Sequence, residues 1–410
     1  MFSFVQNYSR QVAISIVFNC DFFWTFKRTC GIIVIPQKQW RNIMQQRIIC
    51  GDTIAEMKKL PSGSIDLIFA DPPYWMRTEG VLTRVEGTDF DGCNDDWDQF
   101  QSLEDYDKFT EDWLTECYRL LKPNGSIWVI GGMQCIYSIG SIMQKLGFWF
   151  INDVIWHKKN PTPNFMGTRL NNSHETLLWA TKSKKAKYTF NYKTGKELNN
   201  DTVTEEAFAK GERKQLGSVW RIAVCQGTER LKTDDGNKLH STQKPEEILY
   251  RVIAISSKMG DVVLDPFGGT MTTAAMAKKL GRQYIMIERD EIYCEYGQKR
   301  LDAIEFEDTP IARAAYDEKP LKVSMEQMIA AGYFTEGEWF YFKVGDGVAQ
   351  LCADGKLNYN GEIIDMHSCA AIAKGVKANR LNGFDYWYVK RDGKLVSIAE
   401  VRDNYRKSLK

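Results

Sequence analysis

Residues 261–288 constrain the fold more than any other part of this sequence. They read as a short apolar run, a glycine turn at Gly268 and Gly269, a helix-like segment and a second apolar run that ends in Glu288. Glycines let a backbone approach a ligand closely, and a helix N-terminus favours a carboxylate or phosphate. Glu288 follows Asp265 at roughly the 20-residue spacing at which α/β nucleotide-binding units place an acid on ribose hydroxyls. The pattern predicts an α/β protein with ligand sites at the carboxyl edge of a parallel sheet.

The order of residues in the glycine turn narrows the choice of ligand. The turn lacks the Gly-x-Gly-x-x-Gly spacing of dinucleotide sites and the Gly-x-x-x-x-Gly-Lys spacing of triphosphate sites. S-adenosylmethionine fits the pattern better than either. Taken alone, the glycines would indicate only a tight turn, so the prediction depends on the whole unit of strand, turn, helix, strand and acid.

A tetrapeptide far upstream, Asp71-Pro72-Pro73-Tyr74, follows an apolar run at residues 65–70. The exocyclic amine of adenine is a poor nucleophile because its lone pair is delocalised into the ring. The Asp71 carboxylate and the Pro72 carbonyl can each accept one amine hydrogen, which directs the lone pair at a methyl donor. The prolines stiffen the loop, and Tyr74 offers a flat face for a base taken out of its duplex. The alternative interpretation is an ordinary loop that ends a strand.

Together, the two motifs resemble a DNA adenine N6-methyltransferase of the beta order, in which the catalytic half precedes the cofactor half. Further blocks resemble the cell-cycle-regulated methyltransferases and their restriction-system relatives that modify GANTC. These blocks include Asp96-Trp97-Asp98-Gln99-Phe100, Asn160-Pro161-Thr162-Pro163-Asn164-Phe165, His174-Glu175-Thr176-Leu177 and His240-Ser241-Thr242-Gln243-Lys244-Pro245. The resemblance implies a Rossmann-like, S-adenosylmethionine-dependent sheet in circularly permuted order, followed by a small C-terminal α+β domain.

The resemblance also implies roles for residues at matching positions. Asp71, Pro72, Pro73 and Tyr74 would hold the target adenine. The cofactor would be bound by Asp52, Asp71, Thr242, Lys244, Asp265, Phe267, Gly269, Thr270, Thr272, Thr273 and Glu288. Within this set, Glu288 would take the ribose hydroxyls, Asp52 would contact the adenine of the cofactor, and Lys244 would lie near its amino-acid end. A turn or helix-cap residue is the alternative interpretation of Asp52.

Three positions depart from the family pattern. Met271 stands where a second glycine is usual, and we expect its side chain to narrow the approach to the cofactor. Phe384 stands where tryptophan is expected, so it keeps an aromatic face but lacks the indole donor. Trp75 replaces the usual Asn after the catalytic tyrosine, which changes the expected shape of the base pocket.

The charge of the chain is nearly balanced. It has 54 Lys and Arg residues against 53 Asp and Glu residues, which leaves a net charge of +1. A DNA-binding protein needs local positive potential, so the charge must be distributed unevenly over the surface. Basic stretches at residues 182–187, 210–214 and 402–410 are each more typical of a solvated face than of a DNA contact. Arg169, beside the expected active-site loop, is the better candidate for a phosphate contact.

Cysteine and histidine usage indicates a reducing compartment and no metal. The ten cysteines include no Cys-x-x-Cys pair, and the four histidines are far apart in sequence. Methyl transfer of this type requires neither a metal nor a nucleophilic cysteine. We therefore expect a cytoplasmic, nucleoid-associated protein of bacterial type.

The first 47 residues are the least coherent part of the sequence. They are rich in Phe, Ile, Val and Trp, but polar residues interrupt every run before it reaches the roughly 18 apolar residues of a membrane span. Because the resemblance begins near Ile48, we predict that Met44 is the true start and that the preceding segment contributes nothing to function. If the segment is native, it should form an extra hydrophobic layer or a dimer contact.

The rest of the chain divides by composition and pattern. Residues 48–304 are expected to form the methyltransferase domain, in which the polar residues 186–239 suit a mobile insertion that closes on DNA. Residues 305–320 are charged and punctuated by proline, which predicts a linker. Residues 321–410 have short apolar runs separated by Gly-Asp-Gly, Asp-Gly-Lys and Asn-Gly turns, which predict a small α+β domain.

The family resemblance makes this C-terminal domain a DNA-recognition element. We expect most of its aromatic residues to form its core. Asn382 and Phe384 are the pair expected to reach DNA, and Trp387 is a further candidate. In the first domain, the DNA-binding candidates are Asn164 and Arg169.

The sequence therefore predicts an adenine-specific enzyme that binds double-stranded DNA, flips an adenine and transfers methyl from S-adenosylmethionine to its N6 nitrogen, within GANTC. It is expected to be a homodimer or a flexible monomer without a membrane anchor. One alternative is an amino-methyltransferase acting on RNA or cytosine, although cytosine enzymes more often carry Ser in place of Asp71. The other is a catalytically impaired DNA-binding homologue, suggested by Met271 and the N-terminal segment.

Overall fold

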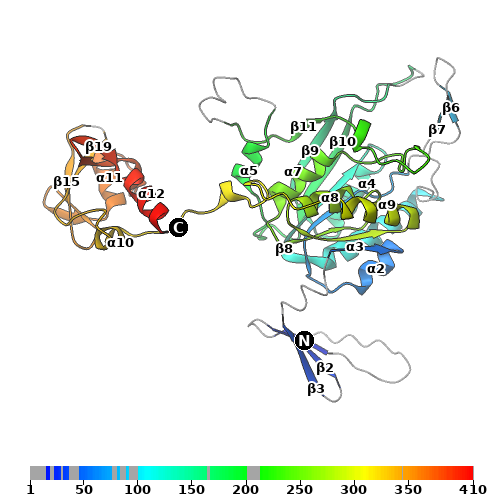
Figure 1. The fold of residues 1–410 in the computed structure, drawn as a ribbon, viewed down its shortest axis with the longest axis horizontal. Helices are drawn as coiled ribbons and strands as arrows, with labels where there is room; N and C mark the ends of the chain where they lie inside the picture. Colours follow the sequence, from blue (N-terminus) through cyan, green and yellow to red (C-terminus); the bar gives the residue numbers. More distant parts are fainter. Residues whose placement is uncertain are drawn as a thin grey trace. The chain divides into compact units, whose positions relative to one another are not determined.

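The computed structural model divides the chain into two compact units, Met1–Asp317 and Glu318–Lys410 (Figure 1). It describes residues 15–18, 23–28, 31–36, 46–75, 81–83, 89–91, 100–163, 167–200, 213–343 and 345–409. Among these residues, none of the helices is both long enough and apolar enough to cross a membrane.

The first unit is built on an eight-stranded sheet with the order β11-β9-β10-β8-β5-β12-β13-β4. Its strands are β4 (Arg47–Cys50), β5 (Ile65–Ala70), β8 (Leu121–Gly131), β9 (Trp149–Lys158), β10 (His174–Thr181), β11 (Val219–Ile222), β12 (Val262–Asp265) and β13 (Gln283–Glu288). The run from β8 to β4 is parallel, as expected. β10 runs antiparallel to both of its neighbours, β8 and β9. The sheet is therefore mixed, which corrects the expectation of a purely parallel one.

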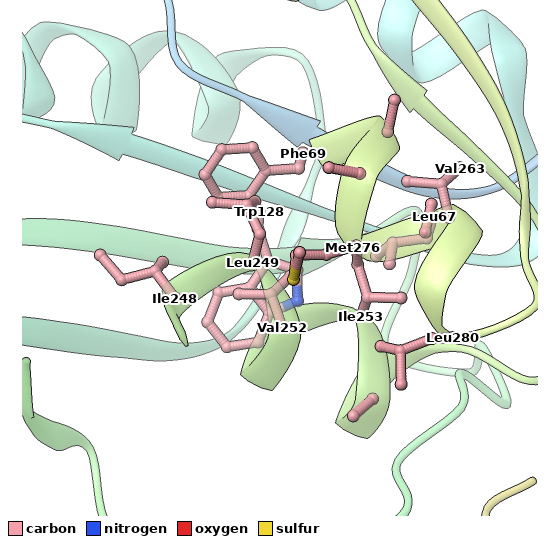
Figure 2. Close-up of a cluster of buried hydrophobic side chains, with 14 of the residues drawn as sticks. Leu67, Phe69, Trp128, Ile248, Leu249, Val252, Ile253, Val263, Met276 and Leu280 are labelled. Atoms are coloured by element: carbon pink, nitrogen blue, oxygen red, sulfur yellow. The ribbon is translucent and has the colours of Figure 1, made fainter. Parts of the chain in front are cut away.

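Helices cover both faces of this sheet. They are α2 (Thr53–Lys59), α3 (Leu103–Leu120) and α4 (Ile136–Lys145) on one face, and α7 (Glu246–Ser256) and α8 (Thr272–Lys279) on the other, with α9 (Glu291–Asp302) beside α8 and β4. Along β5, Leu67 and Phe69 face α7 and α8, whereas Ile68 and Ala70 face the opposite layer. Figure 2 shows the α7 and α8 side of this core. Because both faces are buried, β5 reads as a continuous apolar run.

Helix α3 illustrates how the sequence sets these boundaries. Its N-cap Ser102 accepts a hydrogen bond from the Asp105 backbone N–H. Tyr106, Trp113 and Cys117 recur at helical spacing and are buried against the sheet. The helix ends at Leu120, where the segment with Pro123 and Gly125 begins β8.

Two small antiparallel sheets complete the strands of this unit. β1 (Ser15–Phe18), β2 (Phe23–Arg28) and β3 (Gly31–Pro36) form one of them, and β6 (Val81–Thr83) and β7 (Asp89–Asp91) form the other. Met44, the predicted start, lies outside the described residues. The predicted start and the dispensability of the preceding segment remain predictions.

Residues 186–239 are more closely integrated into the fold than expected. This region contributes α5 (Tyr192–Glu197), which lies against α7, the strand β11 and the short helix η2 (Gly227–Glu229). Trp220 of β11 is 1% exposed and belongs to the core, and its side chain packs beside Trp128 of β8. β11 of this region is therefore part of the sheet, and the closing of the region on DNA stays a prediction.

The second unit is a six-stranded antiparallel sheet with the order β17-β16-β15-β14-β18-β19 and three α-helices. Its elements are α10 (Met325–Ala330), β14 (Trp339–Phe342), β15 (Val348–Leu351), β16 (Leu357–Tyr359), β17 (Glu362–Ile364), α11 (Met366–Lys374), η4 (Gly383–Asp385), β18 (Trp387–Arg391), β19 (Lys394–Ser397) and α12 (Ile398–Ser408). The three predicted glycine turns separate β14 through β17, and the unit has a core of its own.

The boundary between the units differs from the predicted linker. Ala312 is fully buried in the core of the first unit, and its carbonyl accepts a hydrogen bond from Arg282. Asp317, at the end of η3 (Ala315–Asp317), accepts backbone hydrogen bonds from Lys193 and Thr194. Residues 305–317 therefore belong to the first unit, and the division falls after Asp317.

Candidate active site

The sheet brings the two sequence motifs together at one edge. Asp71 follows β5, the glycine turn follows β12, and Glu288 ends β13, and these three strands are parallel neighbours. They surround a cavity of about 360 Å³. All predicted catalytic and cofactor residues line it: Asp52, Asp71, Pro72, Pro73, Tyr74, Thr242, Lys244, Asp265, Phe267, Gly269, Thr270, Thr272, Thr273 and Glu288.

The Asp71 carboxylate has one paired oxygen and one unpaired oxygen. Oδ2 lies 2.8 Å from Lys244 Nζ. Oδ1 is buried, and no group in the described part of the chain donates a hydrogen bond to it. Burial raises the pKa of Asp71, and the Lys244 ammonium opposes this rise. A buried acceptor without a partner is costly, so Oδ1 is suited to a donor that a ligand brings.

Tyr106 of α3 holds the Asp-Pro-Pro-Tyr loop in place. The Tyr106 hydroxyl donates to the Pro73 carbonyl at 2.9 Å. Tyr106 also stacks on Trp75, with ring centroids 5.8 Å apart. Pro72, between Asp71 and the anchored Pro73, lines the cavity. Trp75, the departure from the family pattern, has a φ of 49°, so its backbone adopts a left-handed conformation that turns the chain after Tyr74.

Tyr74 is held by its hydroxyl and by its ring. The hydroxyl donates to Glu175 Oε2 at 2.8 Å, and Lys244 Nζ lies 4.9 Å from the ring centroid. Burial and the nearby carboxylates of Asp71 and Glu175 raise the pKa of Tyr74 well above its usual value. Tyr74 is therefore a neutral donor with a fixed ring.

The glycine turn is organised by Asp265. Its Oδ1 accepts from the Phe267 N–H at 3.0 Å and its Oδ2 accepts from the Thr273 hydroxyl at 2.5 Å. This pairing closes the turn onto the first residues of α8. The Gly269 N–H, where φ is +49°, donates to Glu288 Oε2 at 2.7 Å. Glu288 and the glycine turn are thus joined directly by a hydrogen bond.

Asp52 has the helix-cap role that was the alternative interpretation, and its contact with the cofactor stays a prediction. It is the N-cap of α2, and its side chain accepts from the Ala55 N–H at 2.9 Å. It also lines the cavity. The next residue, Thr53, donates its hydroxyl hydrogen to the Pro266 carbonyl and so ties α2 to the glycine turn.

Met271 does not narrow the cavity, which corrects the expectation from sequence. It is fully buried, adopts a left-handed φ of 61° at the N-cap of α8, and is absent from the cavity lining. Its side chain extends against Gly268 and Gly297 instead. The left-handed backbone explains why glycine is the usual residue here, because glycine adopts this conformation without strain.

Sequence reasoning missed several residues around the cavity. Glu175 and Lys158 form an ion pair of 2.7 Å beside Tyr74. His240 and Tyr293 line the cavity with ring centroids 4.9 Å apart. Arg300 donates to the Thr270 carbonyl at 2.9 Å and supports the glycine turn from behind. Glu175 lies in the block His174-Glu175-Thr176-Leu177 of the family resemblance, but no role was assigned to it from the sequence.

The predicted DNA contacts have different outcomes. Arg169 is exposed and donates to Asn172 Oδ1 at 3.0 Å, whereas Asn164 lies outside the described residues. Asn382 is exposed and donates to Asp385 Oδ2 at 2.8 Å.

Two aromatic residues of the second unit are poor candidates for contacting DNA. Trp387 is fully buried in the core of that unit, because β18 is a central strand with helices packed on it. Phe384 is 8% exposed, and the Arg402 guanidinium lies 3.8 Å from its ring centroid. The prediction that these two side chains reach DNA is therefore corrected to a role in packing.

The residues present fit S-adenosylmethionine. Glu288 offers carboxylate oxygens at the end of β13, and the glycine turn and the start of α8 lie beside it. Asp71 Oδ1 supplies an unpaired acceptor for an amine at the other side of the same cavity. Within the described residues, no group of three or more His, Cys, Asp or Glu side chains is arranged to hold a metal ion. The fold and the site together define an S-adenosylmethionine-dependent methyltransferase of exocyclic amines.

A family model and two sequence relatives agree with this class. A family model described as DNA methylase matches residues 65–299. The chain is 48% identical over 364 residues to the Type II methyltransferase M.HinfI of Haemophilus influenzae, which covers 89% of this chain and 98% of that protein. It is 36% identical over 271 residues to the Type II methyltransferase M2.DpnII of Streptococcus pneumoniae, covering 66% of this chain and 94% of that protein. The crystal structure of the M1.HpyAVI–SAM complex is 26% identical, covers 62% of this chain and 98% of that chain, and has a TM-score of 0.44.

The chain therefore belongs to the DNA methylase family. It is an S-adenosylmethionine-dependent DNA methyltransferase, and the acid at the first position of the Asp71-Pro72-Pro73-Tyr74 tetrapeptide agrees with its assignment as adenine-specific.

Proposed function

We propose that this enzyme methylates the N6 nitrogen of adenine within GANTC in duplex DNA. The chemistry rests above all on Asp71 Oδ1, a buried acceptor that is unpaired among the described residues and lines the same cavity as Glu288. The sequence specificity rests on the blocks at residues 96–100, 160–165, 174–177 and 240–245, which resemble those of GANTC-modifying enzymes. The 48% identity to M.HinfI, over 89% of this chain and 98% of that protein, supports a similar specificity.

In the proposed mechanism, Asp71 Oδ1 and the Pro72 carbonyl each accept one hydrogen of the adenine amine. This takes the nitrogen lone pair out of conjugation and aims it at the methyl donor. S-adenosylmethionine supplies an electrophilic methyl group when it is bound. The ring of Tyr74 stacks on the flipped adenine.

Lys244 and Glu288 assist the reaction through binding. Burial lowers the pKa of Lys244, but the charges of Asp71 and Glu175 outweigh burial, so that the net shift is upward and the ammonium stays charged. Its charge helps to keep Asp71 ionised and able to accept. Glu288 accepts hydrogen bonds from the ribose hydroxyls. Asp71 need not act as a strong base, because the product cation loses its proton easily after transfer.

The decisive experiment is methyl incorporation from labelled S-adenosylmethionine into matched duplexes. One duplex contains GANTC, a second has the target adenine replaced, and a third has the same composition in a different order. Incorporation into the first duplex alone, with N6-methyladenine identified by mass spectrometry, would support the proposal. Equal labelling of the third duplex would refute GANTC specificity, and N4-methylcytosine as the product would refute the adenine chemistry.

Arg169 is the proposed phosphate contact of the first unit. Replacing a residue that contacts one phosphate weakens binding to all sequences and reduces the slope of log K against log salt by about 0.9. Arg169→Ala should show this change, and Arg169→Lys should largely restore the slope. An unchanged slope in Arg169→Ala would remove this residue from the interface.

Three further properties of the enzyme belong to the same proposal. We place it in the GANTC-modifying, cell-cycle-regulated group, in association with the nucleoid, and we expect a homodimer or a flexible monomer. Analytical ultracentrifugation with and without a GANTC duplex distinguishes the two states. Methylation that persists in a chelator would support a mechanism without a metal.

A further inference from the structure

Glu175 links the catalytic tyrosine to two lysines inside the site. Its Oε2 accepts from the Tyr74 hydroxyl at 2.8 Å and lies 4.0 Å from Lys244 Nζ. Its Oε1 lies 2.7 Å from Lys158 Nζ. The Glu175 side chain is only 12% exposed, so solvent screens these interactions weakly.

The strand topology explains how Glu175 reaches the site. β10 runs antiparallel to β8 and β9, so the beginning of β10 lies at the sheet edge where the parallel strands end. Glu175 is the second residue of β10, and Lys158 is the last residue of β9. Two neighbouring strands thus place the Glu175 carboxylate and the Lys158 ammonium beside Tyr74.

The charges in this cluster depend on one another. Lys244 lies between the two carboxylates, 2.8 Å from Asp71 Oδ2 and 4.0 Å from Glu175 Oε2. Removing the charge of Glu175 would leave Lys244 paired with Asp71 alone and Lys158 without its carboxylate. It would also weaken or remove the acceptor of the Tyr74 hydroxyl, which a buried donor needs.

We propose that Glu175 is a positioning residue of the methyl transfer, which fixes the Tyr74 ring through its hydroxyl and shares Lys244 with Asp71. The proposal rests on the roles of Asp71 and Tyr74 given under the proposed function. It adds a residue that contacts neither methyl donor nor adenine and acts through two residues that do.

The test compares Glu175→Gln, Tyr74→Phe and the double variant on the GANTC duplex. Because both single changes disrupt one link, each should lower kcat at least about tenfold, and the double variant should be no worse than the poorer single variant. Calorimetric binding of S-adenosylmethionine should be retained. Losses that multiply in the double variant would overturn the proposal.

A pH profile separates positioning from a general structural role. The Glu175 carboxylate raises the pKa of Asp71, so Glu175→Gln should shift the acidic limb of the kcat profile to lower pH. An unshifted limb would overturn the proposal. Tyr74→Phe keeps Glu175 and removes only one hydroxyl, so its kcat can be measured even if Glu175→Gln folds poorly. An unchanged kcat in Tyr74→Phe would also overturn the proposal.

A second acid provides the matched control. Asp66 pairs with Lys122 at 2.7 Å and accepts from the Val262 N–H, at the opposite end of β5 from Asp71. Asp66→Asn should lower stability without changing kcat or the pH profile. If wild-type enzyme fails to methylate adenine, the proposed function fails. If wild type methylates and Glu175→Gln matches it in kcat and pH profile, only the role of Glu175 fails.

Discussion

The Met271 side chain occupies the space that a side chain at position 297 would need. A Cβ added to Gly297 in α9 would overlap Met271 Cγ and lie 3.3 Å from Met271 Cβ. Met271 therefore fills the junction between α8 and α9, and Gly297 makes room for it. The two residues together replace the glycine that the family usually has at position 271.

The contact between Met271 and Gly297 predicts that Gly297→Ala changes stability in opposite directions with and without the Met271 side chain. Gly297→Ala should destabilise the wild type by about 1–3 kcal/mol through overpacking. Met271→Gly should cost about 2–5 kcal/mol through the cavity it leaves, offset in part by relief of the left-handed strain. In the Met271→Gly background, Gly297→Ala should become stabilising, because alanine favours a helix over glycine by about 1 kcal/mol. Urea denaturation of the four proteins measures the cycle, and additive effects would contradict it.

The same cycle checks the corrected role of Met271. Since its side chain does not line the cavity, Met271→Gly should leave the affinity for S-adenosylmethionine unchanged. Calorimetric titration measures this affinity. Markedly tighter binding by the variant would restore the original expectation that Met271 narrows the approach.

Asp71→Ala should abolish transfer while cofactor binding is largely retained. The variant loses the acceptor that orients the adenine amine, and a loss of at least about a thousandfold in kcat is expected for a group that acts mainly in the transition state. Single-turnover transfer and calorimetric cofactor binding measure the two properties. Asp66→Asn is the control for removing an acid from the same strand, and appreciable activity in Asp71→Ala would contradict the mechanism.

The buried Asp265 predicts a pH dependence of stability. Burial raises its pKa well above the usual range, although the Thr273 hydroxyl and the Phe267 N–H oppose the rise. The folded protein thus retains a proton that the unfolded chain releases near pH 4. Stability from this group is present below that pH and is lost as pH rises through the folded pKa. The unfolding free energy of Asp265→Asn should therefore increase relative to that of the wild type as pH rises from about 4. Urea denaturation at a series of pH values measures this difference. A difference that does not change with pH would contradict the prediction.

Two neighbouring residues of the second unit should separate DNA binding from folding. Asn382 is exposed, so Asn382→Ala should weaken binding to a GANTC duplex without lowering the unfolding free energy. Phe384 is packed beneath Arg402, so Phe384→Ala should cost about 3–5 kcal/mol of stability. Equilibrium DNA binding and urea denaturation of both full-length variants test this assignment. Unchanged DNA affinity in Asn382→Ala would exclude the contact.

A chain that begins at Met44 should fold and methylate as well as the full chain. Among the residues that the structure describes, those that line the cavity all lie at or after Asp52 in sequence. Thermal unfolding and methyl incorporation compare the two proteins directly. Lost folding or activity in the shorter chain would show that the preceding segment matters.

The sequence predicted the parts of the site that lie where parallel strands end. Asp71 and Glu288 follow apolar runs, and such ends gather at one edge of a parallel sheet. The position of Glu175 in the site was not predicted because Glu175 lies at the beginning of a strand. An apolar run does not reveal the direction in which a strand runs. The reversal of β10 had to be seen in the sheet itself.

Burial was the other property that the sequence did not settle. Trp387 and Trp220 lie in segments with many polar residues, and only the neighbouring strands show that both side chains are enclosed. The turns of the second unit were easier to predict, since Gly345, Gly355 and Gly361 have positive φ values that glycine favours. Local backbone geometry depends on adjacent residues, whereas burial depends on residues far away in the sequence.

The second unit has its own core and joins the first through a single crossing of the chain after Asp317. A change within that core alters packing among residues that all belong to the second unit. Over evolutionary time, such a unit can diverge, be exchanged between lineages or be replaced, while the catalytic sheet is passed on intact. The two units of one gene can therefore have different evolutionary histories.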